Sequence, residues 1–543
     1  MSDPIDLATD YYLNNFKKLT EHALDWYADF LSPTESEWLT QFDQLEHSAQ
    51  CLLIRLLSRR GHWFRSDKLQ YDEIPNLTDA LKQLELSRFI AINSTISEQE
   101  IGRVLLTKAE LVSLFAPLNK SLRKEQLIAE LSPQPYSDFE SLEFDVIELL
   151  NPKIISLLLT LFFANTHQDL SQFVLDDLGL HQFENYPLSK TRRFFTSRSE
   201  VDQLLLLADL QSQYTEGNRK DAHYLLTLLE SLPHEIEHHY IERKRQHLIN
   251  DIARDLERLE QYEHSIYWFN QTKLPPAKER LARIYDKLND IASMCDVVTA
   301  MLQHPHDIAE LEIAHKLEQR LKRKQGEKIP REKKPVLSEY HLELDLSSQR
   351  VELAVKEYFE QQGYQVFYAE NMLLNGLFGL AFWDAIFAPV ESAFINQYQH
   401  RPLDLYHSDF IAKRKEKIDE VLHAIQHDGF DHLCSVYEQK YGLSNPFVHW
   451  SLFSKTLLDA CIESMPKKLI TELFKVMLQD LKLFRNGMPD LMLFKDGDYQ
   501  WVEVKGPGDK LQDNQWRWIK QFSRLDVNFS VCYVKHREAG ITP

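Results

Sequence analysis

Two short segments near the end of the chain carry acidic and basic side chains at a spacing suited to catalysis. Residues 485–494 read RNGMPDLMLF and residues 501–510 read WVEVKGPGDK, separated by a Lys-Asp-Gly-Asp stretch. Asp-Gly steps favour tight hairpin turns, so we expect antiparallel strands over 491–494 and 501–505. Because side chains alternate between the two faces of a strand, Glu503 and Lys505 share one face, with Asp490 at its edge.

These groups suit the hydrolysis of a phosphodiester. A VEVK strand alone is usually only amphipathic, and a Pro-Asp step alone is usually a turn, so the prediction depends on both occurring together. Carboxylates such as Asp490 and Glu503, a few ångströms apart, bind Mg²⁺ or Mn²⁺, and the backbone carbonyl of Val504 is an expected further ligand. The ammonium group of Lys505 can orient the attacking water or stabilise the pentavalent phosphorane.

The segment after the second strand predicts a helix that begins beside the same site. Gly-Pro-Gly-Asp at 506–509 predicts a tight turn, and Asp509 is placed to cap the following helix. Leu511 and Trp518 lie on the apolar face of this helix, and Gln515 lies on the same face. A polar side chain there is either a hydrogen-bonded edge residue or a site residue. We favour the site role because the helix follows the ExK strand directly.

Length and glycine content divide the chain into a helical front and an α/β end. A chain of 543 residues predicts about three or four domains. Of the 15 glycines, five precede residue 340 and ten follow it, which suits stacked helices first and turns between strands later. The first hundred residues show helical periodicity with one possible short hairpin, and they carry no chemistry of their own.

Residues 106–131 predict two short helices with a basic junction. Thr107 and Glu110 form a capping-box pattern that starts the first helix. Lys120, Arg123 and Lys124 gather at the start of the second. Such a pair resembles the SAP module, a small DNA-binding helical hairpin. A purely structural helical hairpin fits this segment equally well.

The region from 150 to 320 is almost entirely helical in pattern. Residues 252–269 and 278–301 share one scheme, a leucine-containing helix followed by a polar turn and a second apolar helix. This resembles a degenerate tetratricopeptide pair, and an irregular α-bundle is the alternative. Residues 320–334 then hold eight Lys or Arg against two acids, as a linker or as a phosphate-contacting segment.

The C-terminal motifs resemble a known nuclease domain. PD…VEVKGPGDKLQDNQWRW resembles the VRR-NUC domain of the PD-(D/E)xK superfamily. The wider chain resembles the bacterial form of the Fanconi-anaemia-associated nuclease family, with further matches at YAE (368–370), LFGLAFWDAIF (377–387) and PLDL (402–405).

The resemblance implies a fold class and a domain order. The N-terminal two-thirds is expected to be mainly α, with a SAP-like module and tetratricopeptide-like repeats. The C-terminal part is expected to be an α/β nuclease with a mixed central sheet. The predicted domains are an N-terminal helical domain (1–103), a SAP-like module (104–150), a tetratricopeptide-like domain (151–335) and a VRR-NUC domain (336–543).

The resemblance also implies roles for particular residues. Glu370 becomes a third acidic metal ligand with Asp490 and Glu503, which fits two metal ions, although one ion remains possible. Lys482 and Arg485 are expected to contact DNA phosphates near the scissile bond. The family binds the 5′ end of a DNA flap through a basic pocket in its helical region. The aligned positions, of which the first and last are favoured, are Arg243, Lys244, Arg245, Lys278 and Arg280.

The combined prediction is a metal-dependent, structure-specific DNA nuclease. The resemblance implies 5′-flap endonuclease and 5′-to-3′ exonuclease activity that leaves 5′-phosphates, and a role in DNA repair, including interstrand crosslinks. The expected partner is branched or flapped duplex DNA with a 5′ end. Two alternatives remain open: a resolvase for Holliday junctions or other branched DNA, and a catalytically inactive helical-repeat scaffold.

Several classes are disfavoured by what the sequence lacks. No GxxxxGK[ST] motif is present, so no nucleotide cofactor is expected. The longest apolar run, 154–164, is about half of the ~20 residues that a membrane span needs. The start, MSDPIDLATD, does not resemble a signal peptide, and the five cysteines form no CxxC pair, so we expect a cytoplasmic protein. The net charge of −20 leaves room for a local basic groove.

Overall fold

The computed structural model describes residues 8–115, 118–165, 168, 182–330, 335–427 and 429–537. Residues 331–334, within the basic stretch noted above, lie outside this set. The chain divides into two units, one of residues 1–180 with 195–208 and one of residues 181–194 with 209–543. Each unit has its own cores and is described by itself.

The first unit combines helices with a small antiparallel sheet. Its strands are β1 (Trp63–Arg65), β2 (Ile90–Ile92) and β3 (Val146–Leu149), in the order β1-β3-β2. Most side chains of β3 are buried. Helix α8 (Ile154–Phe163) packs on α1 (Tyr11–Tyr27) because it is apolar on nearly every face. The other helices of this part are α2 (Pro33–Asp43), α3 (His47–Leu57) and α4 (Leu77–Leu86).

The predicted domain bounds can be placed on these elements, and the bounds themselves stay a prediction. Strand β3, which lies within the predicted SAP-like module (104–150), pairs with β1 and β2, and α8, which lies within the predicted tetratricopeptide-like domain (151–335), packs on α1. Strand β3 pairs with strands more than fifty residues earlier in the chain, and local sequence patterns do not predict pairing over that separation. The SAP-like segment contains three short helices around a common apolar core: α5 (Glu98–Val104), α6 (Lys108–Leu114) and α7 (Lys124–Glu130).

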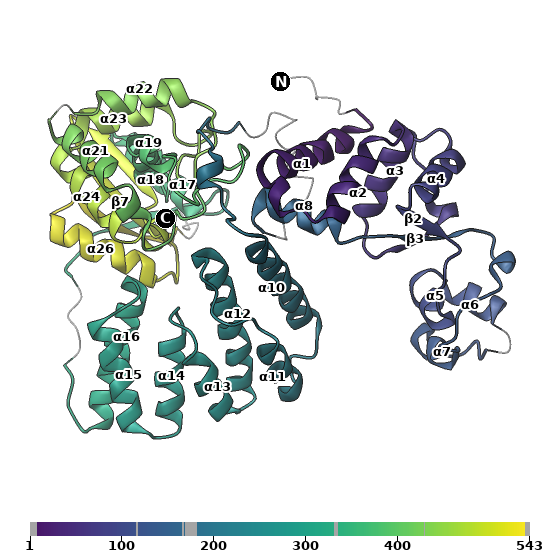
Figure 1. Cartoon of the computed structure of the whole chain (residues 1–543). Helices are drawn as coiled ribbons and strands as arrows, with labels where there is room; N and C mark the ends of the chain where they lie inside the picture. The colour runs from purple at the N-terminus through teal and green to yellow at the C-terminus, as the bar shows by residue number, and fades with distance from the viewer. Residues whose placement is uncertain are drawn as a thin grey trace, which may run out of the picture. The chain divides into compact units, whose positions relative to one another are not determined.

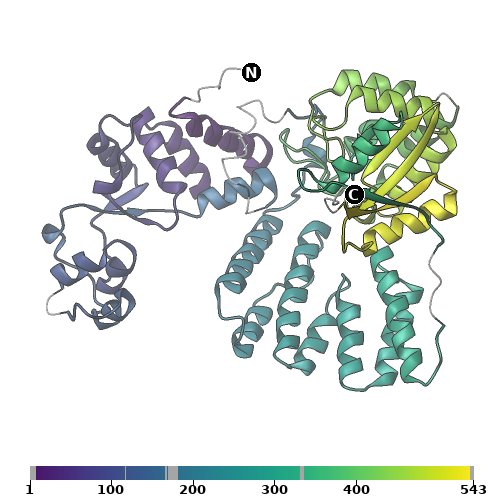
Figure 2. The same cartoon turned by 180° about the vertical axis from the view of Figure 1, so that it is seen from behind.

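The second unit begins with a row of helices that pack on their sequence neighbours, side by side in Figures 1 and 2. The α12–α13 turn has Glu260 at φ 61°, and the α14–α15 turn has Asn289 at φ 57°, so the two predicted repeats turn in the same way. The helices are α10 (Arg198–Glu216), which enters from the first unit, α11 (Ala222–Glu230), α12 (His239–Arg258), α13 (Tyr262–Phe269), α14 (Ala277–Lys287), α15 (Ile291–Gln303) and α16 (Ile308–Lys324).

A mixed five-stranded sheet forms the centre of the C-terminal part, in the order β4-β8-β7-β6-β5. Strand β8 pairs in parallel with β4 and β7, and the other pairs are antiparallel. The β6–β7 turn is Asp496-Gly497, with φ of 53° and 82°, as tight hairpins require. The strands are β4 (Ser338–Leu344), β5 (Gln365–Tyr368), β6 (Leu491–Lys495), β7 (Asp498–Lys505) and β8 (Phe529–His536).

Helices cover both faces of this sheet. Helix α17 (Val351–Gln361) packs over Leu491, Leu493, Val502 and Val504, and a larger core with Met492 and Trp501 covers the other face. That second core is built from α18 (Leu373–Ala381), α19 (Trp383–Ile386), α20 (Phe410–Lys413), α21 (Lys415–His427), α22 (Asp431–Lys440), α23 (Lys455–Ser464), α24 (Lys467–Gln479), α25 (Leu481–Phe484) and α26 (Asp513–Leu525).

The fold class predicted from the sequence is confirmed: a helical front and a C-terminal α/β part with a mixed sheet. Among the described helices, none combines the length and the apolar character needed to cross a membrane.

A buried ion pair fixes the loop between α19 and α20. Arg414 donates two hydrogen bonds to Asp404, at 2.7 and 3.0 Å, and their side chains are 0% and 5% exposed. We expect Asp404→Asn to lower the free energy of unfolding by about 3–5 kcal/mol, because it leaves a buried guanidinium without its counter-charge. Denaturant unfolding measures this. Asp459→Asn, in an exposed pair with Lys455, is the control and should change it by less than about 1 kcal/mol.

Candidate active site

The β6–β7 hairpin brings two carboxylates and one ammonium group together on the face that α26 covers. Asp490 lies directly before β6, and its Oδ2 accepts a hydrogen bond of 2.8 Å from the backbone N–H of Val504. Glu503 Oε1 accepts a bond of 2.5 Å from Lys505 Nζ. The exposed fractions of Asp490, Glu503 and Lys505 are 8%, 2% and 8%.

Burial makes the charged forms of both carboxylates costly. Burial first, and then repulsion from Asp490, raise the pKa of Glu503 to about 8, against the charge and the hydrogen bond of Lys505. Burial also raises the pKa of Asp490 to about 6, against the hydrogen bond from Val504, and Glu370 and Glu352 add repulsion. At neutral pH, Glu503 is therefore mainly protonated, and the charges of Asp490 and Lys505 largely balance.

Gln515 reaches this pair from the first turn of α26. Its Nε2 donates to Glu503 Oε1 at 2.5 Å, while its Oε1 accepts from the backbone N–H of Gln512 at 2.9 Å. The second bond belongs to a capping box in which Gln512 is the N-cap. The prediction that Asp509 caps this helix is therefore wrong: its carboxylate accepts from Gly506 N–H, three residues earlier, and closes the turn.

Glu370 follows β5 and lies beside the hairpin, because Ala369 N–H donates to the backbone oxygen of Asp490 at 2.7 Å. The carboxylate of Glu370 accepts hydrogen bonds from Tyr368 Oη and from Asn371 Nδ2. Within the described residues, no three His, Cys, Asp or Glu side chains converge as a metal-binding group. The charge of Glu370 nevertheless raises the pKa of Asp490.

The donor set nevertheless fits a divalent cation. Two buried carboxylates with raised pKa values are oxygen ligands whose mutual repulsion a cation would relieve. The backbone groups of one strand residue point toward the same edge. Because Val504 N–H points toward Asp490, the carbonyl of Val504 lies on the same edge of β7 as that carboxylate.

Sequence reasoning missed two residues around the site. Glu352, near the start of α17, raises the pKa of Asp490, but nothing in its helical surroundings distinguishes it from an ordinary surface acid. The hydroxyl of Tyr406 accepts a hydrogen bond from Arg485, the predicted phosphate contact, and the guanidinium lies 5.5 Å from the Tyr406 ring centre. That tyrosine lies in the loop that the Asp404 pair fixes.

Three of the predicted DNA-binding residues gather around one histidine. Loss of hydration lowers the pKa of His247, and the charges of Arg243, Lys482 and Lys244 lower it further. Lys244 Nζ lies 5.3 Å from the ring centre of Tyr240. Arg243 and Lys244 lie on α12, and Lys482 lies on α25.

The other predicted DNA-binding residues have different surroundings. In the helical array, Arg245 is buried in an ion pair with Glu242 at 2.8 Å, and Arg280 is paired with buried Glu257. Lys278 donates to the backbone oxygen of His304 at 3.1 Å. In the first unit, Lys120 and Arg123 are exposed, and Lys124 donates to the backbone oxygen of Arg103 at 3.0 Å. Their contacts with DNA stay predictions.

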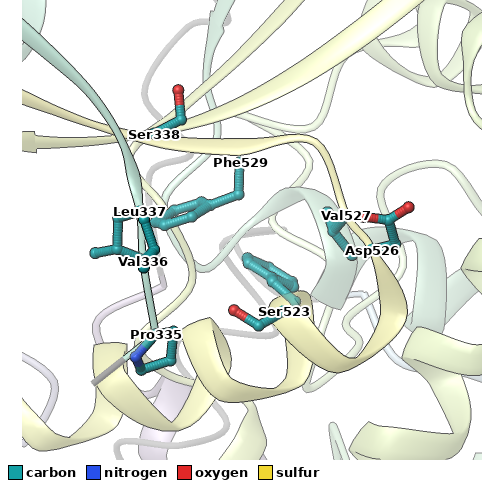
Figure 3. Close-up of a pocket in the computed structure, with 9 residues that line it drawn as sticks. Pro335, Val336, Leu337, Ser338, Ser523, Asp526, Val527 and Phe529 are labelled. Atoms are coloured by element: carbon teal, nitrogen blue, oxygen red, sulfur yellow. The ribbon is translucent and has the colours of Figure 1, made fainter. Parts of the chain in front are cut away.

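A hollow of about 390 Å³ lies at the far end of α26 (Figure 3). It is formed by the segment that enters β4, the end of α26 and the start of β8. Its lining contains none of the acids or the lysine described above, so we assign it no part in the chemistry.

Family models match three parts of the chain. They are described as "FAN1, HTH domain" at residues 10–91, "Fanconi anemia-associated nuclease SAP domain" at 104–137 and "VRR-NUC domain" at 430–536. A "Fanconi-associated nuclease 1 homolog" from Pseudomonas aeruginosa is 32% identical, over 97% of this chain and 96% of its own length. The chain belongs to the Fanconi-associated nuclease 1 family.

Other members of the Fanconi-associated nuclease 1 family and a solved structure are also similar to this chain over most of its length. The Arabidopsis thaliana homologue is 24% identical over 97% of this chain and 67% of its own length. A crystal structure of paFAN1 bound to 2nt 5′ flap DNA with gap matches with a TM-score of 0.86 and 31% identity, over 98% of this chain and 100% of the other. The chain is thus a DNA-cleaving hydrolase. Sequence reasoning had found no function for its first hundred residues, where the HTH model matches.

The raised pKa of Glu503 predicts a pH dependence of stability without metal. The folded state binds this proton more tightly than the unfolded chain, whose pKa is near 4.5. Stability of the metal-free protein should therefore fall as pH rises from 4.5 to 8, and Glu503→Gln should remove the part of that fall above pH 6, where Asp490 no longer contributes. Thermal unfolding in a chelator between pH 5 and 9 tests this. Parallel curves for the two proteins would contradict it.

Proposed function

We propose that this chain is a divalent-metal-dependent nuclease that cuts duplex DNA at 5′ flaps, degrades DNA from 5′ to 3′ and leaves 5′-phosphates. The observation that carries the proposal is the buried set of Asp490, Glu503 and Lys505 on one hairpin. The similarity of the whole chain to nucleases, including one solved with 5′ flap DNA, supports the choice of substrate. The biological role that follows is DNA repair, including that of interstrand crosslinks.

The acids and one carbonyl of the hairpin region would hold the metal. We assign this role to the carboxylates of Glu370, Asp490 and Glu503 and to the carbonyl oxygen of Val504. The ion is Mg²⁺ or Mn²⁺, because both prefer oxygen ligands, and the acids suffice for one ion or two. When bound, the ion neutralises phosphate charge and lowers the pKa of a coordinated water.

The side chains of the site then act on the phosphodiester directly. Water attacks phosphorus, the bond to the 3′-oxygen breaks, and the products are a 5′-phosphate and a 3′-hydroxyl. Lys505 donates hydrogen bonds to the attacking water or to the phosphorane oxygens as negative charge grows there. Its burial strengthens this effect, because little water competes for the charge. Gln515 orients Glu503 through the 2.5 Å bond.

Basic residues at the junction of α12 and α25 would hold the DNA. Arg243, Lys244 and Lys482 lie close enough together to act jointly on His247, so they can act jointly on phosphate groups. Arg485, four residues before Pro489, is held by a hydrogen bond to Tyr406, and we assign it a contact with a phosphate near the scissile bond. The SAP-like segment offers Lys120, Arg123 and Lys124 as a separate contact.

The catalytic assignment predicts large effects from small changes. Asp490→Asn and Glu503→Gln should each lower kcat for a 5′-phosphorylated flap by at least about 10³-fold, and Lys505→Met by about 10²–10³-fold. Single-turnover cleavage in Mg²⁺ and in Mn²⁺ measures this. Asp498→Asn, at the exposed turn of the same hairpin, is the matched control and should cleave normally.

The same assay separates the alternative functions. Cleavage undiminished in Asp490→Asn and Glu503→Gln would overturn the site assignment. Failure of the wild-type protein to cut any branched DNA would favour an inactive scaffold. Paired, symmetric cuts in four-way junctions, in preference to flaps, would favour a resolvase.

The basic residues divide into two groups with different expected effects. Arg243→Gln and Lys244→Gln should weaken flap binding and should each reduce the slope of log K against log [salt] by about one. Arg245→Met should instead lower thermal stability, because it leaves buried Glu242 unpaired. Fluorescence anisotropy at several salt concentrations, with thermal unfolding alongside, distinguishes the two. A change in salt slope for Arg245→Met but not for Arg243→Gln would reverse the assignment.

A further inference from the structure

We propose that Arg517 is a positioning residue: through its ion pair with Glu312, the last helix of the helical array sets the first turn of α26, and thereby Gln515, against Glu503. This proposal rests on the proposed function of the hairpin site. It concerns the way in which that site is held, and it connects the helical array to the chemistry.

The first turn of α26 is tied to the site through a single side chain with two bonds. Gln515 Oε1 belongs to the capping box, and Gln515 Nε2 donates to Glu503. Because the amide is rigid and both ends are engaged, a shift of the helix start moves the donor relative to the carboxylate. The position of this turn therefore sets the length and angle of the hydrogen bond that Glu503 accepts.

The same turn also touches the loop that leads to Asp490. Gly487 has φ of +87°, and a Cβ added there would lie 2.7 Å from the backbone of Asn514. Trp518 Nε1 donates to the backbone oxygen of Asn486 at 3.2 Å. The start of α26 thus contacts the loop before Asp490 and, through Gln515, Glu503 itself. The close approach at Gly487 leaves this end of the helix little room to move toward the loop.

The other side of α26 faces α16. Arg517 donates from two nitrogens to the two carboxylate oxygens of Glu312, at 2.9 and 2.8 Å. The Arg517 side chain is 12% exposed and that of Glu312 is 40% exposed, so the pair is partly shielded from water. A second pair, Lys316 with Asp513, is 70% and 83% exposed and contributes little.

The two helices do not close on each other completely. A hollow of about 380 Å³ lies between them, lined by α16 side chains such as His315 and Gln319 and by Trp516 and Lys520 of α26. Side chains across such a gap hold the helices less firmly than a packed apolar seam would. The bidentate pair of Arg517 and Glu312 therefore fixes the distance and the rotation between α16 and this part of α26.

Helix α16 ends the array that includes α12 and α14, where the predicted DNA-binding residues lie. Each helix of that array packs on the next, so a change in its curvature reaches α16. Because Arg517 of α26 is paired with Glu312 of α16, a shift of α16 moves α26 with it. The arrangement makes the geometry around Glu503 depend on the array as well as on the sheet.

The test uses the full-length protein and four variants. Arg517→Met and Glu312→Gln should lower kcat for a 5′-phosphorylated flap by about tenfold and raise the Mn²⁺ concentration for half-maximal activity, with KM for DNA changed by less than about twofold. The charge swap Arg517→Glu with Glu312→Arg should recover most of kcat. Glu318→Gln, which removes a partly exposed pair with Lys322 within α16, is the matched control and should behave as wild type.

A double-mutant cycle tests whether Arg517 acts through Gln515. In a Gln515→Ala background, Arg517→Met should cause no further loss of kcat, because the bond that it positions is already gone. Additive losses would overturn the proposal. So would a loss that follows thermal stability across the variants, or an unchanged kcat in both single variants.

Direct metal binding separates this proposal from the proposed function. Calorimetry with Mn²⁺ on the DNA-free protein should show weaker binding for Arg517→Met than for wild type, and normal binding for Glu318→Gln. Wild-type protein that binds no Mn²⁺ and cuts no flap would mean that the proposed function has failed. Wild-type binding and cleavage with an unaffected Arg517→Met would mean that only the positioning role has failed.

Discussion

The arrangement of the nuclease part depends on one electrostatic constraint: two carboxylates and one ammonium group share a site with almost no water. Buried carboxylates stay charged only when other groups compensate them. Asp490 has the N–H of Val504, while Glu503 has Lys505 and Gln515. This compensation is incomplete, because burial still raises the pKa values of both acids. A divalent cation would supply the missing compensation and displace the proton that Glu503 otherwise keeps.

That constraint explains why so many parts converge on one hairpin. The tight Asp-Gly turn sets the register of β6 and β7, and the register sets which side chains share a face. Helix α26 must start close to Glu503, which requires a glycine at 487, where its backbone meets Asn514. On the outer side, α16 holds α26 through Arg517. The helical array therefore supports the site and also carries candidate contacts for DNA.

The sequence predicted those parts of the site that local rules determine. The hairpin, its alternation and the helix after it follow from turn chemistry and periodicity. Glu370 is not adjacent to the motif, so only the family resemblance pointed to it. The sequence predicts Asp509 as the N-cap of α26 because Asp is a common N-cap residue, whereas the structure has Gln512 at that position. The ion pair of Arg280 with Glu257 depends on how helices pack, and periodicity does not give packing.

The most direct test of the central claim is the proton balance of metal binding. At pH 7, Glu503 is mainly protonated in the metal-free protein, because its pKa is about 8. Mn²⁺ binding should therefore release about one proton, less at pH 9, and Glu503→Gln should nearly abolish the release. Calorimetry in buffers of different ionisation enthalpy measures it. Binding without proton release at pH 7, or the same release in Glu503→Gln, would contradict the account.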